Sequence, residues 1–68
     1  MKLSPLIEEK VANKGYKKSF VAEKLNISVR QFRKYETGES LIPIDKAYIL
    51  SRLLGCKIDD LYEWEDEE

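Results

Sequence analysis

Two short segments of helical periodicity, separated by only two residues, constrain the fold of this chain most strongly. Residues 18–25 and 28–37 both carry apolar side chains at helical spacing. Asn26 between them tolerates left-handed backbone angles, and Ser28 followed by Gln31 is the pattern of a capping box. A helix of two turns cannot bury its own apolar face, so we predict that the two helices cross sharply over a common core.

The remaining apolar residues predict helices before and after this pair. A Ser-Pro start signal and apolar residues at helical spacing predict a first helix over residues 5–14. A further helix is predicted over residues 44–54, closed by a glycine. A short last helix is predicted over residues 59–63, with Leu61 and Trp64 packing back onto the core.

Length and composition indicate one small domain. The chain has 68 residues, of which 43% are hydrophobic, a normal fraction for a globular domain near the lower size for independent folding. No strand pattern, repeat or internal linker is visible. The predicted fold class is therefore all-α, a compact bundle of four to five helices over residues 1–64, followed by an acidic tail at residues 65–68.

The residue types exclude several kinds of site. Histidine is absent and Cys56 is the only cysteine, so the chain has no internal disulfide, Cys/His zinc site, or Ser-His-Asp or Cys-His catalytic group. We expect no enzymatic activity, no metal and no cofactor. Because no apolar run approaches the roughly 18 residues of a membrane span, and Glu8 and Glu9 lie where a signal peptide would be apolar, we expect a cytoplasmic protein without a membrane partner.

The small net charge of −1 hides a segregation of charge along the chain. Residues 1–38 carry nine basic and four acidic residues, which makes this half +5. Residues 39–68 carry three basic and nine acidic residues, which makes that half −6. Such an asymmetry favours an anionic partner on the basic side, and an ordinary charged surface is the alternative interpretation.

The helix predicted over residues 28–37 has two different faces. At 100° per residue, Phe32 and Tyr35 lie on the side predicted to enter the core. The opposite side carries Val29, Arg30, Arg33, Lys34 and Thr37. This face suits a DNA major groove, because guanidinium groups bind guanine O6 and N7 and valine offers a methyl surface to thymine. A solvated cationic helix face is the alternative.

The stretch VAEKLNISVRQFRKYETG resembles the Cro/repressor-type helix-turn-helix family of DNA-binding regulators. The positions that carry the resemblance are Ala22, Leu25, Ile27, Ser28, Phe32, Tyr35, Glu36 and Gly38, and the similarity runs on over roughly residues 6–62. It implies a lambda-repressor-like bundle in which the third helix reads the major groove and the second lies across the DNA backbone.

The resemblance also assigns expected roles to residues of this chain. The base-reading candidates are Val29, Arg30, Arg33 and Lys34, and the phosphate-binding candidates are Lys17, Lys18, Gln31 and Thr37. The chain departs from the family where Val11 replaces a helix 1 arginine near Glu36. It departs again where Lys17 replaces a capping Ser or Thr, and where residues 39–42 are acidic then apolar instead of basic.

We therefore expect a small transcriptional regulator, a repressor of bacterial or phage (prophage) type. One reading helix covers few base pairs, so we expect a homodimer, at least on DNA, that binds a palindromic operator. The dimer candidates are Leu41, Ile42, Tyr62 and Trp64. The alternative is a protein-interaction module on the same scaffold, antirepressor- or antitoxin-like, that binds a basic protein partner.

Overall fold

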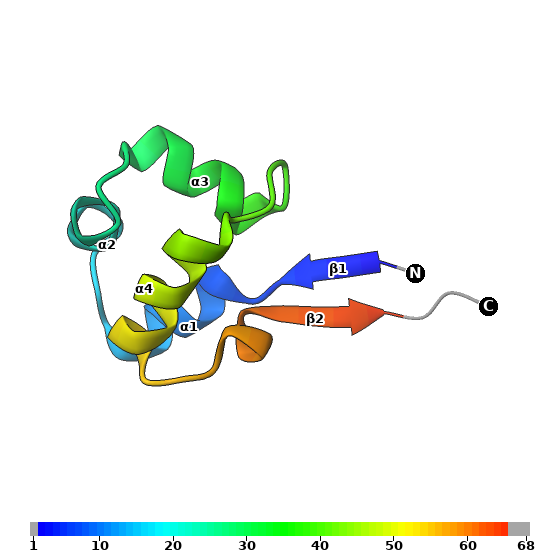
Figure 1. The fold of residues 1–68 in the computed structure, drawn as a ribbon. Helices are drawn as coiled ribbons and strands as arrows, with labels where there is room; N and C mark the ends of the chain where they lie inside the picture. Colours follow the sequence, from blue (N-terminus) through cyan, green and yellow to red (C-terminus); the bar gives the residue numbers. More distant parts are fainter. Residues whose placement is uncertain (1, 66–68) are drawn as a thin grey trace.

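Helices form one end of the molecule and a two-stranded sheet projects from the other (Figure 1). The computed structural model describes residues 2–65. In chain order its elements are β1 (Lys2–Pro5), α1 (Ile7–Lys14), α2 (Lys18–Lys24), α3 (Val29–Thr37), α4 (Ile44–Leu54), the 3-10 helix η1 (Ile58–Leu61) and β2 (Tyr62–Glu65).

The local signals around α3 are confirmed, except that among the described residues only the Ser28 half of the predicted capping box forms. The backbone N–H of Gln31 donates to Ser28 Oγ at 3.0 Å, which caps the helix at its start. Gly38 ends the helix with φ of 85°, in the left-handed region that glycine adopts without strain. Asn26 has φ of 59° in the turn before the helix, as its residue type predicts. The predicted helices over residues 44–54 and 18–25 are also present, the latter one residue shorter.

The predicted start of the first helix is wrong. Pro5 lies in β1, and α1 begins at Ile7 with Leu6 as its N-cap and no side-chain hydrogen bond to the cap. The backbone N–H of Leu6 donates to the carbonyl of Leu61 at 2.8 Å. This bond ties the entry of α1 to the far end of the chain, so the Ser-Pro segment extends into a strand and does not open the helix.

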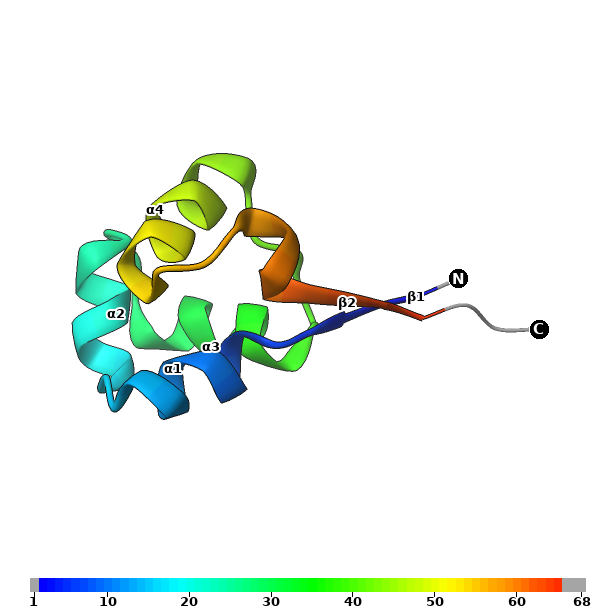
Figure 2. The same ribbon diagram turned by 90° about the horizontal axis from the view of Figure 1, so that it is seen from below.

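The predicted last helix and the expected absence of strands are also wrong. Residues 58–61 form the 3-10 helix, and the chain then enters β2, which pairs antiparallel with β1. Leu3 lies opposite Trp64 in this pairing, and Trp64 is 56% exposed instead of packing onto the core. The strand pair forms from the two ends of the chain, and Figures 1 and 2 show it extending away from the helices.

One apolar core joins all four helices and η1. Its buried members are Ile7, Val11, Val21, Ala22, Leu25, Phe32, Tyr35, Ala47, Leu50, Leu54 and Leu61. The prediction that Phe32 and Tyr35 enter the core is thereby confirmed. Cys56 is a free, half-buried thiol packed against this core. Among residues 2–65 no helix is long and apolar enough to cross a membrane.

The predicted acidic tail lies mostly beyond the part of the chain that the structure describes. Glu65 is the last residue of β2, so the strand reaches one residue further than the predicted domain boundary. Residues 66–68 lie outside the described residues.

Candidate nucleic-acid interface

The α2–α3 pair places one helix at the surface of the molecule. The turn between them is closed by the backbone N–H of Ile27, which donates to the carbonyl of Ala22 at 3.0 Å. Phe32 is fully buried and Tyr35 nearly so, which fixes α3 on the core by one face. The other face therefore points outward along the upper edge of the molecule (Figure 1).

The outward face of α3 brings three of the predicted base-reading residues together. Arg30, Arg33 and Lys34 line one open hollow, with the end of α3 and the following turn completing it. Both arginines are exposed and Lys34 is half-buried. Val29 lies apart from them: it is half-buried against the core and lines a separate hollow between α2 and α3.

The predicted phosphate-binding residues have different surroundings. Lys17 is exposed at the N-cap of α2, and no side chain caps that helix, as the lysine there predicts. Gln31 is half-buried beside the α3 cap. The hydroxyl of Thr37 donates to the carbonyl of Lys34 at 3.3 Å, so this side chain also closes the last turn of α3.

Lys18 makes contacts that the sequence did not predict. Its Nζ lies 3.3 Å from Oε1 of Glu36 and 3.5 Å from Oε2 of Glu8. The Glu36 side chain is only 2% exposed, and its Oε2 is buried with no hydrogen-bond partner among the described residues. Lys18 thus joins α1, α2 and α3, and it supplies Glu36 with the cation that Val11 in α1 does not.

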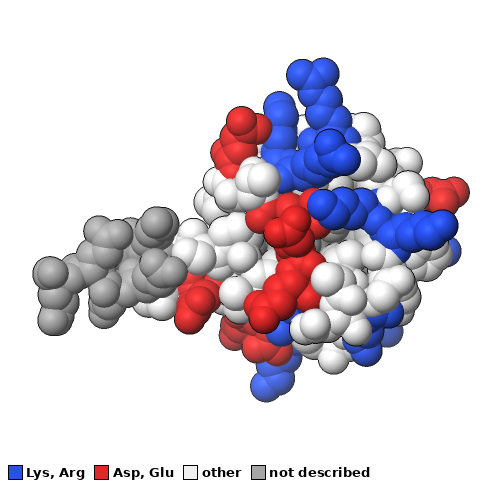
Figure 3. Space-filling model, turned by 180° about the vertical axis from the view of Figure 1, so that it is seen from behind, with Lys and Arg blue, Asp and Glu red and all other residues white. Residues whose placement is uncertain are grey.

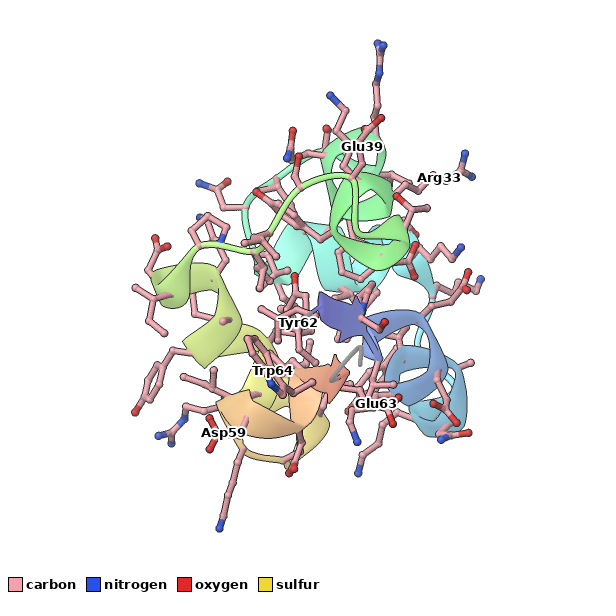
Figure 4. All side chains as sticks on the ribbon, turned by 90° about the vertical axis from the view of Figure 1, so that its right-hand side faces the viewer. Arg33, Glu39, Asp59, Tyr62, Glu63 and Trp64 are labelled. Carbon is pink, nitrogen blue, oxygen red and sulfur yellow. The ribbon has the colours of Figure 1, made fainter. Side chains whose placement is uncertain are left out.

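Charge is distributed unevenly over the surface. Figure 3 shows basic side chains gathered at the upper edge, where α3 lies, and at the side of α2; acidic side chains lie between and below them and also reach the upper edge, and further basic side chains lie at the bottom. Figure 4 shows Arg33 at one end of the molecule and Asp59 and Glu63 at the other. The outward face of α3 therefore offers a polyanion the three cations Arg30, Arg33 and Lys34, with the carboxylate of Glu39 beside them.

Three of the four dimer candidates line an apolar groove next to the sheet, and Trp64 is not among its lining residues. Leu41, Ile42 and Tyr62 line it together with Leu3 and residues of α4 and η1. Leu41 is 64% exposed, whereas Ile42 and Tyr62 are half-buried and linked, because the Ile42 N–H donates to Tyr62 Oη at 3.1 Å. Trp64 is exposed on β2, opposite Leu3.

A sequence profile of the helix-turn-helix family matches residues 7–61. The chain therefore belongs to the Cro/repressor-type helix-turn-helix family. This is a family of DNA-binding regulators and not of enzymes, which makes the chain a DNA-binding regulator in general terms. No curated protein sequence matches the chain. The profile match begins at the first residue of α1 and ends at the last residue of η1, so β1 and β2 both lie outside it.

Proposed function

We propose that this protein is a sequence-specific transcriptional repressor that binds double-stranded DNA with α3 in the major groove. The observation that carries the proposal is the hollow formed by Arg30, Arg33 and Lys34 on the outward face of α3. This helix is the second of a helix-turn-helix pair, the element that enters the groove in this architecture. Occupancy of an operator then excludes polymerase from the promoter.

Each base-reading residue has a chemical role in this proposal. Arg30 and Arg33 present exposed guanidinium groups that bind the O6 and N7 atoms of guanine in bidentate fashion. Lys34 donates to the same acceptors as a single charge. Val29 is half-buried near the start of α3, and its exposed part contacts a thymine methyl group at the edge of the site.

Contacts to phosphate fix the register of α3 on the duplex. The residues proposed for this role are Lys17, Lys18, Gln31 and Thr37. Lys17 is exposed at the start of α2, where it has the most freedom to reach a phosphate. Lys18 shares its charge with two carboxylates, so we expect a smaller contribution to phosphate binding from Lys18 than from Lys17.

A second copy of the chain binds the apolar groove in this proposal. One helix reads only a few base pairs, so useful affinity requires two half-sites about 34 Å apart in a palindromic operator. The groove lies beside the loop that follows α3 and beside the base of the sheet. Burying Leu41 and Trp64, which are 64% and 56% exposed, between two copies removes apolar surface from water next to the DNA-binding face.

Selection of bound duplexes from a pool with about 20 random base pairs tests the proposal, since sites of one to two helical turns are expected. We expect a palindromic sequence to be enriched, and binding to weaken steeply as salt rises, with the slope set by the number of phosphate contacts. An unenriched pool with weak, unselective binding would contradict sequence-specific reading.

The dimer is tested separately on the selected duplex. Analytical ultracentrifugation should give two chains per duplex for the wild type and a loss of the second chain for Leu41→Ser. Tyr48→Ser is the matched control, because Tyr48 is 54% exposed but lies outside the groove. Equal stoichiometry for both variants and the wild type would remove the groove from the interface.

The alternative, a module that binds a basic protein, is supported by the acidic end of the molecule around Asp59 and Glu63 (Figure 4). The same binding experiment separates the two functions. Absence of binding to any duplex even at low salt favours the protein-binding module, whereas a steep salt dependence favours the repressor.

A further inference from the structure

A single carboxylate lies within the basic hollow of α3. Glu39 lines this hollow together with Arg30, Arg33 and Lys34, so one of its four charged groups is negative. Figure 4 shows Glu39 and Arg33 at the same end of the molecule, far from the other labelled acidic groups. A surface built only to attract phosphate would be weakened by a negative charge at this position.

The backbone holds Glu39 in a fixed position beside the last turn of α3. Its N–H donates to Thr37 Oγ1 at 3.4 Å, and the hydroxyl of Thr37 in turn donates to the carbonyl of Lys34. The N–H of Ser40 donates to the same carbonyl of Lys34 at 3.2 Å. These bonds tie the turn to α3, so the Cα of Glu39 moves with the helix that enters the groove.

The carboxylate of Glu39 is available to a ligand. Glu39 is exposed, and within residues 2–65 no ion pair joins it to the neighbouring cations. An ionised carboxylate is a pure acceptor of hydrogen bonds. In the major groove the donors that it meets are exocyclic amino groups, and cytosine N4 is the one that carboxylates read in protein–DNA complexes.

We propose that Glu39 is a specificity-determining residue that accepts a hydrogen bond from the N4 amino group of a cytosine. This inference rests on the proposed binding of DNA by α3. On the preferred sequence, the hydrogen bond from the amino group replaces the hydrogen bonds to water that the carboxylate loses in the complex. On any other sequence Glu39 is left facing acceptor atoms and phosphates without a donor, which weakens the wrong complex more than the right one.

Two substitutions of Glu39 distinguish recognition of a base from electrostatic repulsion of the DNA. Glu39→Gln removes the charge and keeps an amide that pairs with adenine N6 and N7, so selection from random duplexes should shift one position from cytosine toward adenine. Glu39→Ala should remove the preference at that position, which for the wild type we expect to be about fivefold or more. Both variants should bind a fixed duplex of random sequence about twofold to fivefold more tightly, because a repulsive surface charge is lost.

Asp59→Asn is the matched control, because it also removes one exposed carboxylate but at the opposite end of the molecule (Figure 4). It should leave the selected sequence unchanged and alter the affinity for random duplex less than either Glu39 variant does. Both Glu39 variants should keep wild-type circular dichroism spectra, since the bonds that hold the turn come from the backbone of residue 39 and not from its side chain.

The outcomes distinguish this inference from the proposed function. If the wild type enriches a sequence and both Glu39 variants enrich the same sequence at every position, Glu39 does not read a base and the inference is wrong. The same conclusion follows if affinity for random duplex rises without any change in base preference. If the wild type itself enriches no duplex sequence, the proposed function is wrong, and the inference about Glu39, which rests on it, is wrong as well.

Discussion

Substitution of Lys18 tests how α3 is held in place. The Glu36 side chain is 2% exposed and its carboxylate lies 3.3 Å from the Lys18 ammonium, so Lys18→Met leaves a buried charge without a cation. Breaking a buried pair in this way costs about 3–5 kcal/mol. Because the Lys18 side chain is 41% exposed, water screens part of this interaction, and we expect a loss of about 2–3 kcal/mol.

Urea unfolding followed by far-ultraviolet circular dichroism measures this loss. With a slope of about 1 kcal/mol per molar urea for so small a domain, the midpoint for Lys18→Met should fall by about 2–3 M. The double variant Lys18→Met/Glu36→Leu should recover most of the loss, because replacing both members of a buried ion pair with apolar residues is often close to neutral. Lys17→Met, at the exposed neighbouring position, should stay within about 0.5 kcal/mol of the wild type.

Equal stability of Lys18→Met and Lys17→Met would refute this reasoning, since it would mean that Glu36 needs no cation. A double variant no more stable than Lys18→Met alone would also refute it, because the cost would then come from lost packing of Lys18 and not from an unpaired carboxylate.

Three further substitutions test the packing of α3, the turn that follows it and the contacts to phosphate. Phe32→Ala should cost about 3–5 kcal/mol and leave the domain largely unfolded in thermal circular dichroism scans; a folded variant that lost only DNA binding would mean that α3 faces the other way. Gly38→Ala should cost about 1–3 kcal/mol in urea unfolding, because φ is 85° and the new Cβ would lie 3.3 Å from Pro5 Cδ; no loss would contradict the close approach of α3 and β1. Lys17→Ala should weaken binding to all duplexes alike and lower the salt slope by about one unit, and an unchanged slope would remove Lys17 from the interface.

Local signals in the sequence predicted α2, α3 and α4 because each signal acts within one turn, whereas the Ser-Pro signal failed because Pro5 lies in β1. Ser28 and Gly38 fix the ends of α3 through one side-chain acceptor and one left-handed residue. The strands could not be predicted in this way. Leu3 and Trp64 are partners from opposite ends of the chain. The four residues of β2 do alternate between aromatic and charged, but those of β1 do not, and a short alternating run does not identify the strand it pairs with.

The same distinction between local and long-range features applies to the candidate site. The face shared by Arg30, Arg33 and Lys34 follows from their spacing on a single helix, so the sequence alone predicts it. The Lys18–Glu36 contact joins two helices, and a residue pair of this kind is visible only after the helices are packed. In the sequence, Glu39 stands out only as a departure from the basic loop of the family. Its place beside the α3 cations depends on how the turn after Gly38 folds back.

Base reading by α3 is measured by the affinity of Arg33→Ala for the selected duplex and for a random duplex at the same salt concentration. We expect a loss of about 1–3 kcal/mol on the selected duplex and a much smaller loss on the random one, and the same pattern for Arg30→Ala. Equal losses on both duplexes would make these arginines contacts to phosphate and leave α3 without a base-reading role.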